Sequence, residues 1–402
     1  MSILNPGRLV AGRTLLAVES GAHAEDLMGE AELARADDRA LAWHIALGVL
    51  RRQGSLDHLL RPRLDRPVAE LDAPVRVSLR VGLFERLFSR TAEHAAVEQA
   101  VELCRRLGAP RATGLVNAVL RRVRVESLPD DPRLDLPEWW ARRWAHAPQW
   151  LARLQEMAPL CGVWAVPPES RPALNTAPAS AGGEGIEDCF TLPGSRGAVD
   201  QLPGFADGAY WIMDPAAAKV ADLGWEALGR PTEGWTALDA CAAPGGKSFR
   251  LRRRGATVTG VDLDPRRLER VREGASRLKM TISTQFHDWL RGPLPGGSSY
   301  DLVLVDAPCT GLGTLRRHPE IRWRRVPSDP AAMALRQRPI LAAASAHVAP
   351  GGVLVYAVCS PEPEEGEGVV QGLAGWQVER RWSSAPPAGD EDAFQAFVLR
   401  RA

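Results

Sequence analysis

The chain of 402 residues has no long apolar run and very little lysine. No stretch approaches the roughly 18 continuous apolar residues that a membrane-spanning helix needs. The N-terminus lacks a cationic start followed by an apolar core, so no signal peptide is predicted. We therefore expect a cytoplasmic protein without a membrane-spanning segment, long enough for two or three domains.

An excess of charge of either sign is also missing, because 50 basic residues face 49 acidic ones and the net charge is +1. Bulk charge therefore gives no indication of nucleic-acid binding. Lysine occurs only at Lys219, Lys247 and Lys279, so arginine supplies almost all of the positive charge. Two local clusters remain informative, with six arginines in 103–125 and five in 316–325.

The six cysteines lack the spacing of a zinc or redox motif, because none lies within four residues of another. Disulfides are not expected in a cytoplasmic chain, and no metal site is predicted. Cys104, Cys161 and Cys189 are interpreted as small buried apolar residues. Cys309 and Cys359 differ, because each lies at the end of a strand-like run.

The pattern of apolar residues divides the chain into three parts. Residues 1–135 are predicted to be helical, since apolar residues recur at helical spacing in 95–107 and 112–123. Residues 136–205 are rich in Pro and Gly and are predicted to form a linker with a small irregular subdomain. In residues 206–402 strands alternate with helices, which predicts a mostly parallel sheet with helices on both faces.

Five strands are expected in this last part, at 235–240, 256–262, 281–286, 301–306 and 351–359. Helices are expected at 265–279 and 329–347. The segments 376–382 and 393–401 are expected to form a closing pair of strands. In such a sheet, ligands bind beyond the carboxyl ends of the strands.

Four polar elements follow these strands in order. AAPGGK (242–247) follows the first strand, and its glycine pair lets a ligand approach the backbone. Asp262 ends the second strand, where its carboxylate can accept hydrogen bonds from a ribose diol. Asp288 after the third strand could receive an adenine amino group, and Asp306 ends the fourth. Each alone is compatible with a turn or a helix cap, but together they favour a nucleoside site.

Two common phosphate-binding loops are missing from the sequence. There is neither G-x-G-x-x-G nor G-x-x-x-x-G-K-[ST], so a dinucleotide site and a P-loop are not expected. An adenosine without phosphates fits the AAPGGK loop better. S-adenosylmethionine is therefore the expected cofactor.

The two thiols suggest methylation of cytosine at C5, a carbon that is a poor nucleophile. A thiolate added to C6 makes C5 enamine-like, so that C5 can attack a sulfonium methyl group. A base then removes the C5 proton and the thiolate leaves. Cys309 and Cys359 could supply the nucleophile and a second polar group that assists release, and Asp306 is suitably placed for the N3 and amino edge of the base.

Four segments resemble the motifs of the Fmu/Sun-type RNA cytosine-5 methyltransferases, namely LDACAAPGGK, GVDLDPRRL, VDAPCTGLGTLRRHPEIRW and YAVCSPEPEE. LRVGLFERLF and GLVNAVLRRV resemble the NusB-like helical domain fused to the bacterial ribosomal members. The resemblance implies an all-α NusB-like RNA-binding domain at 1–135 and an α/β, Rossmann-like class I methyltransferase domain at 206–402. Between them, 136–205 would be a linker and a small RNA-binding subdomain.

The resemblance also implies roles for single residues. Cys359 would be the nucleophile and Cys309 would assist product release, but DNA cytosine methyltransferases use the Pro-Cys cysteine as the nucleophile, so the two roles remain open. Asp306 and Lys247 would contact the base. The implied cofactor-binding residues are Cys241, Ala242, Ala243, Pro244, Gly245, Gly246, Lys247, Asp262, Asp288 and Asp306.

The implied reaction is S-adenosylmethionine-dependent methylation of C5 of a cytosine in small-subunit (16S) ribosomal RNA through a cysteine–C6 adduct. The chain departs from the usual motifs at Val358 in place of Thr, at Gly366 in place of the final Asn, and at Met213 in place of Gln. Two alternatives stay open. One is the same chemistry on transfer RNA, and the other is a non-catalytic RNA-binding ribosome assembly factor, which the altered tail favours.

The expected partner is ribosomal RNA, either naked or in an early particle, and a monomer is expected. The target base must be looped or flipped out, because C5 cannot be reached inside a duplex. Segment 316–325 would either follow the RNA backbone with Trp323 as a stacking face, or form a solvated arginine face beside a buried Trp. The helical domain would capture the folded RNA while the sheet domain performs the chemistry.

Overall fold

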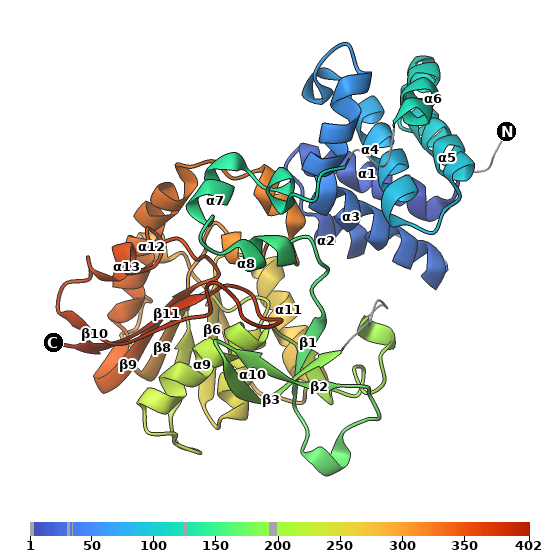
Figure 1. Ribbon diagram of the computed structural model, residues 1–402. Helices are drawn as coiled ribbons and strands as arrows, with labels where there is room; N and C mark the ends of the chain where they lie inside the picture. Colours follow the sequence, from blue (N-terminus) through green and yellow to red (C-terminus); the bar gives the residue numbers. More distant parts are fainter. Residues whose placement is uncertain (1–3, 30–32, 34, 124–127, 193–198) are drawn as a thin grey trace. The chain divides into compact units, whose positions relative to one another are not determined.

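The computed structural model describes residues 4–29, 33, 35–123, 128–192 and 199–402 (Figure 1). The chain splits into two compact units. One comprises Met1–Met157 and Leu315–Arg324, and the other comprises Ala158–Thr314 and Arg325–Ala402. In the described part of the chain, no helix has both the length and the apolarity to cross a membrane. The three-part division expected from the sequence stays a prediction.

The first unit is built from eight α-helices in its described residues, and the first six of them surround one apolar core. They are α1 (Pro6–Glu19), α2 (Ala24–Gly29), α3 (Ala36–Leu60), α4 (Ala73–Phe88), α5 (Glu93–Arg106), α6 (Thr113–Arg122), α7 (Glu138–Arg143) and α8 (Pro148–Arg153). Helices α5 and α6 confirm the two predicted from apolar spacing. Cys104 is fully buried, as expected.

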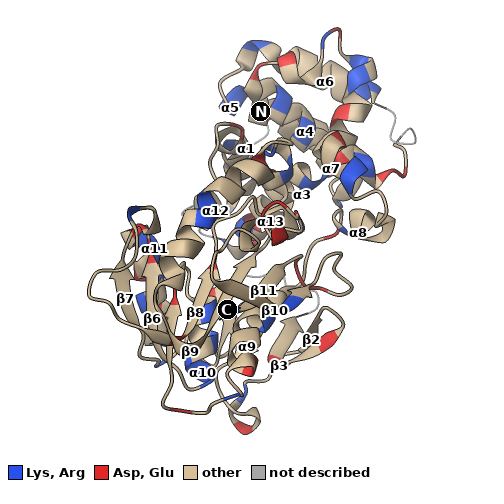
Figure 2. Cartoon of the chain, turned by 90° about the vertical axis from the view of Figure 1, so that its left-hand side faces the viewer, with Lys and Arg blue, Asp and Glu red and all other residues tan. Residues whose placement is uncertain are grey.

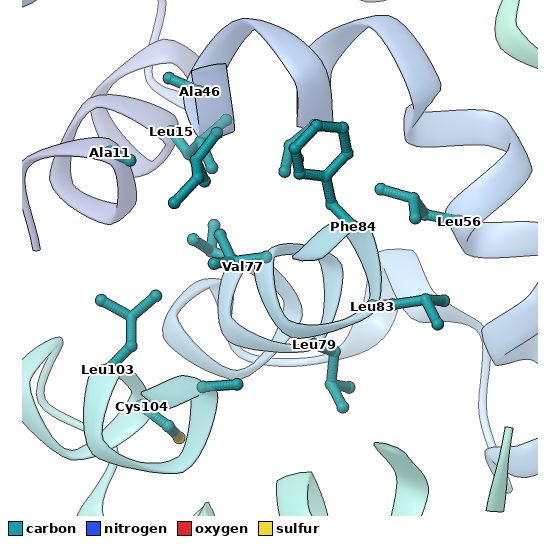
Figure 3. Close-up of a cluster of buried hydrophobic side chains, with 14 of the residues drawn as sticks. Ala11, Leu15, Ala46, Leu56, Val77, Leu79, Leu83, Phe84, Leu103 and Cys104 are labelled. Atoms are coloured by element: carbon teal, nitrogen blue, oxygen red, sulfur yellow. The ribbon is translucent and has the colours of Figure 1, made fainter. Parts of the chain in front are cut away.

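Helix α4 lies at the centre of this core. Figure 3 shows Val77 and Phe84 of α4 among side chains from α1, α3 and α5. Phe84 approaches the backbone of α3 at Gly48, where an added Cβ would lie 2.1 Å from the Phe84 Cζ. Gly48 is therefore required for this close packing.

The first arginine cluster lies at helix ends. Arg105 and Arg106 stand in the last turn of α5, and Arg121 and Arg122 in the last turn of α6 (Figure 2). Cations at these positions complement the helix dipole. Arg106, Arg121 and Arg122 are exposed, as an RNA-binding cluster would require, whereas the predicted Arg124 lies outside the described residues.

The second arginine cluster is more deeply buried than either of its two interpretations expected. Its centre is the short 3₁₀ helix η10 (Pro319–Trp323), which is part of the helical unit. Arg322 has no exposed surface. Its guanidinium donates to the backbone oxygens of Arg51, Asp135, Leu154 and Leu315. The indole of Trp323 donates to the Leu50 carbonyl oxygen at 2.7 Å.

Both readings of segment 316–325 therefore need correction. Arg316 is 5% exposed and Arg322 is fully buried. Neither side chain can therefore contact RNA phosphates or form part of a solvated arginine face. Burial lowers the pKa of Arg322 to about 9. The sequence pattern could not reveal this, because three of the four carbonyls that accept from Arg322 lie at least 168 residues away in the chain.

The second unit contains a small antiparallel sheet that the sequence did not predict. Its strands are β1 (Leu160–Trp164), β2 (Ala177–Ala181), β3 (Glu184–Leu192) and β4 (Tyr210–Ile212), in the order β2-β3-β1-β4. Gly182 and Gly183 join β2 to β3 with φ values of 59° and 81°. Such a two-residue turn favours a hairpin, so the described part of the Gly/Pro-rich segment contains regular strands that the sequence did not predict. Cys161 and Cys189 are buried, as expected.

The larger sheet of this unit has seven strands and confirms the predicted alternation. They are β5 (Thr236–Asp239), β6 (Thr257–Asp262), β7 (Ser283–Phe286), β8 (Tyr300–Asp306), β9 (Val348–Val358), β10 (Trp376–Ser383) and β11 (Gln395–Arg401). Their order is β10-β11-β9-β8-β5-β6-β7. Strands β5 to β9 pair in parallel, whereas β10 and β11 form the predicted antiparallel closing pair.

Helices cover both faces of this sheet. They are α9 (Pro215–Ala227), α10 (Gly246–Arg253), α11 (Pro265–Arg277), α12 (Asp329–Ser345) and α13 (Glu367–Val370). Leu302 and Leu304 of β8 pack in the core that includes α9 and α10. Val303 and Val305 pack in the core that includes α12. Because strands β5 to β9 run parallel, the loops that follow them lie at one edge of the sheet.

Candidate active site

The loop 241–247 leaves β5 and enters α10 in a conformation that only glycine adopts easily. Gly245 has a φ of 114°, and an added Cβ would lie 2.5 Å from the Phe249 Cζ. Behind the loop, the buried Asp239 accepts a hydrogen bond from Ser248 at 2.7 Å. Burial raises the pKa of Asp239 to about 6.

The second and third predicted carboxylates stand on the neighbouring strands. Asp262 at the end of β6 is 4% exposed, and its two oxygens accept from the backbone N–H groups of Ala243 at 3.2 Å and Asp264 at 3.0 Å. Asp288 follows β7 and accepts from the Leu290 N–H at 3.0 Å. Each oxygen of Asp262 keeps a lone pair for a ligand. Asp288 acts as a cap in the described structure.

Lys247 and Asp306 form an ion pair between the loop and the end of β8. The Nζ–Oδ2 distance is 2.7 Å, and the Lys247 side chain is 11% exposed. Burial opposes the charge of Lys247, but the neighbouring Asp306 carboxylate outweighs it and raises the pKa of the ammonium group. The Lys247 side chain is therefore charged at neutral pH.

The two predicted thiols meet at the ends of the adjacent strands β8 and β9. The Sγ atoms of Cys309 and Cys359 are 3.2 Å apart, and both residues are half-buried. The hydrogen bond with Cys359, together with burial, raises the pKa of Cys309 well above its usual value. Cys309 therefore keeps its proton at neutral pH and can donate it toward the sulfur of Cys359.

A cavity of about 550 Å³ lies beside Lys247 and Asp306. Of the predicted residues, it is lined by Cys241, Ala242, Ala243, Pro244, Gly246, Lys247 and Asp306. Gly245, Asp262, Asp288, Cys309 and Cys359 do not line it. Asp262 is nevertheless tied to the lining at Ala243, and Cys359 is one of the groups that raise the pKa of Lys247. The volume is in the range of ordinary small-molecule sites.

Sequence reasoning missed several residues that shape this site. Asp239 lies within the quoted LDACAAPGGK segment and lines the cavity. Glu365 ends the quoted YAVCSPEPEE segment and is fully buried behind the thiols. Nothing in the local pattern distinguishes Glu365 from the preceding Glu364, because burial depends on residues from other strands and helices.

Comparisons with known proteins agree with this arrangement. Residues 227–384 match the family described as 16S rRNA methyltransferase RsmB/F, and residues 5–124 match the NusB family. The ribosomal RNA small subunit methyltransferase B of Thermus thermophilus is 38% identical over 387 residues, covering 94% of this chain and 90% of the relative. The protein of the same name from Vibrio cholerae is 34% identical, covering 91% of this chain and 90% of the relative.

The fold also resembles that of solved structures. The crystal structure of a protein named PH0851 has a TM-score of 0.80 at 19% identity and covers 100% of both chains. A methyltransferase homolog from Pyrococcus horikoshii has a TM-score of 0.53 at 21% identity and covers 68% of this chain. The chain belongs to the 16S rRNA methyltransferase RsmB/F family and is an RNA methyltransferase with a NusB-family helical region.

Proposed function

We propose that this protein methylates C5 of a cytosine in small-subunit ribosomal RNA, with S-adenosylmethionine as the methyl donor and Cys359 as the nucleophile. The observation that carries the proposal is the 3.2 Å approach of the Cys309 and Cys359 sulfurs beside the Lys247–Asp306 pair. A single thiol has many structural explanations. Two thiols facing each other near a partly buried ion pair match the chemistry of addition and release.

The residues at the sheet edge fit S-adenosylmethionine. The loop 241–247 presents backbone to the cavity, and Asp262 keeps acceptor capacity for a ribose diol. Asp288 would face the adenine amino group, and Asp306 would complete the cofactor site. When bound, this cofactor supplies a methyl group on a positively charged sulfur. The missing phosphate-binding loops agree with a ligand that carries no phosphate.

The two thiols and the Lys247–Asp306 pair provide the groups for addition and release. The Cys359 thiolate adds to C6 of the cytosine, which places electron density on C5. Asp306 accepts from the amino edge of the base, and the Lys247 ammonium group holds the Asp306 carboxylate in place through the 2.7 Å contact. After methyl transfer a base such as solvent water takes the C5 proton, the C5–H electron pair re-forms the C5–C6 double bond, and Cys359 leaves with the C6–sulfur pair as the thiolate. Cys309, which stays protonated, assists that release by donating to the departing sulfur.

Trapping of the covalent adduct tests the two thiol roles. Cys309→Ala is expected to accumulate a protein–RNA adduct on denaturing gels, because release is slowed while addition continues. Cys359→Ala is expected to form no adduct and to transfer no methyl group. An adduct formed only by Cys359→Ala would reverse the two assignments.

A methyl-transfer assay separates the candidate substrates. Wild-type protein is given methyl-labelled S-adenosylmethionine with 16S ribosomal RNA, with an early small-subunit particle or with transfer RNA. Label that enters 16S RNA, followed by bisulfite sequencing of the modified base, supports the proposal. Label in transfer RNA alone supports the alternative substrate, and binding of RNA without any transfer supports an assembly factor.

A further inference from the structure

A buried carboxylate behind the two thiols is not used by the reaction as described above. Glu365 has no exposed surface. Its Oε1 accepts from the Thr310 N–H at 2.8 Å and from the Gln337 side-chain amide at 3.1 Å. Its Oε2 accepts from the Ser360 hydroxyl at 2.6 Å and from the Thr310 hydroxyl. Four donors therefore fill the four acceptor positions of one carboxylate.

The donors on Glu365 belong to the two cysteine loops. Thr310 directly follows Cys309, and Ser360 directly follows Cys359. The two hydroxyl oxygens are themselves 3.2 Å apart, the same separation as the two sulfurs. One carboxylate thus joins the loop after β8 to the loop after β9, at the residue next to each thiol.

Further contacts fix Glu365 and its loops to the sheet and to α12. The Glu365 carbonyl oxygen accepts from the Tyr356 hydroxyl of β9 at 2.7 Å. Gln337 of α12 donates both to Glu365 and to the Pro308 carbonyl oxygen, just before Cys309. Glu365 is therefore anchored to β9 and to α12, which are rigid elements of the unit. Charge-assisted hydrogen bonds of this kind are the strong ones in a buried network.

Glu365 is not itself placed to exchange protons with a substrate. It is fully buried, its oxygens are already occupied, and it is not among the residues that line the cavity. A direct role as the base that removes the C5 proton does not fit these contacts. What the contacts can do is set the separation and direction of the two sulfurs.

We propose that Glu365 is a positioning residue that clamps the loops of Cys309 and Cys359, so that the sulfurs stay in contact during addition and release. The inference rests on the proposed roles of the two thiols. Misplacement of reacting groups by about 1 Å can slow a reaction by roughly 100-fold, so loss of the clamp is expected to lower the rate of methyl transfer. Binding of the cofactor, which uses other loops, is expected to change little.

The first test of the clamp measures how readily the two thiols can be bridged, and it does not depend on enzymatic activity. Dibromobimane becomes strongly fluorescent only when two nearby thiols each displace one of its bromides. Wild-type protein is expected to form the bridged product between Cys309 and Cys359, identified by peptide mass spectrometry. Glu365→Ala is expected to form it much more slowly, and Glu365→Gln, which keeps one acceptor oxygen, is expected to lie between the two.

The control residue is Glu367, two positions after Glu365. Glu367 is partly exposed and pairs with Arg381 on the surface, so Glu367→Ala is expected to bridge and to methylate like the wild type. Because Glu365→Ala leaves buried donors without an acceptor, Thr310→Val is the second variant. It removes one hydroxyl of the clamp with little change in side-chain volume and is expected to slow bridging in the same direction.

Kinetics then separate positioning from simple loss of folding. With folding checked by circular dichroism, Glu365→Ala is expected to lower kcat roughly 10- to 100-fold while KM for S-adenosylmethionine stays within about twofold. Bridging and kcat both at wild-type levels in Glu365→Ala or Thr310→Val would overturn the clamp. Slow bridging in these variants, combined with a wild-type protein that transfers no methyl group, would leave the clamp standing and refute the proposed function instead.

Discussion

At the residue scale, the raised pKa of Cys309 bears on the role of this thiol. Its pKa is raised by the hydrogen bond with Cys359 and by burial. A raised pKa means that the thiol form persists at pH values where an ordinary cysteine has begun to ionise. The reactive thiolate at Cys309 is therefore scarce at neutral pH, which fits a proton donor better than a nucleophile.

Alkylation rates test this difference. At about pH 8, iodoacetamide is expected to modify Cys309 much more slowly than a free cysteine, because the alkylating rate follows the thiolate fraction. In Cys359→Ala, where the hydrogen bond is gone, the pKa of Cys309 is expected to fall and its alkylation to accelerate. Peptide mass spectrometry over a pH series measures both rates, and Cys309 reacting like a free thiol near pH 8 would contradict the prediction.

Asp262 tests the cofactor site at the same scale. Asp262→Ala is expected to weaken binding of S-adenosylhomocysteine, since each hydrogen bond to a charged group contributes about 1.5–3 kcal/mol. Calorimetry measures the affinity. The matched control is Asp264→Ala, which removes the N-cap of α11 but no predicted ligand contact. Equal affinities in both variants and the wild type would mean that the ribose binds elsewhere.

At the scale of elements, the short helix η10 depends on one buried guanidinium. Arg322 supplies donors to four backbone carbonyls of the helical unit. Without Arg322 these carbonyls would lose a buried donor, and the loss of a buried hydrogen bond is costly. This explains why an arginine, rather than an apolar residue, occupies a position with no exposed surface.

Arg322→Met is expected to lower the free energy of unfolding by about 3 kcal/mol or more, because the buried acceptors lose their donor. Urea denaturation followed by circular dichroism measures the change. Arg133, whose side chain is exposed beside Asp131, provides the control, and Arg133→Met is expected to leave stability almost unchanged. Similar stability of the Arg322 variant and the wild type would show that the carbonyls find other donors.

At the scale of the whole molecule, the chain does not divide at a single point. Residues 315–324 follow the Cys309 loop in sequence but belong to the helical unit. A fragment beginning at Ala158 would retain this segment without the helices that bury Arg322 and Trp323. Separating the two units therefore exposes side chains that are buried in the full chain.

The fragment 158–402 is expected to aggregate and to bind a hydrophobic dye more strongly than the full chain. Replacement of residues 315–324 by a Gly/Ser linker in that fragment is expected to reduce both effects. Light scattering and dye fluorescence provide the measurements. An unmodified fragment that stays monomeric and binds no dye would show that the segment tolerates solvent.

The sequence by itself determined the strands of the larger sheet and indicated the family. Strand-like runs, the AAPGGK loop and the carboxylates at strand ends follow from short-range patterns, which the backbone obeys locally. The same patterns placed Cys309 and Cys359 at the ends of two strands, and the resemblance of their motifs indicated the family. The prediction of an irregular subdomain in the Gly/Pro-rich segment was wrong for Gly182 and Gly183, because a glycine pair is as compatible with a hairpin as with an irregular loop.

Only the tertiary structure decided which side chains meet. The contact between the two sulfurs joins residues 50 apart, the Thr310–Glu365 hydrogen bond joins residues 55 apart, and the Arg322–Arg51 hydrogen bond joins residues 271 apart. Burial of Glu365 and Arg322 is a property of those long-range contacts rather than of their neighbours in the chain. A charged residue looks the same in sequence on the surface and in the core, because its partners are brought to it by the fold.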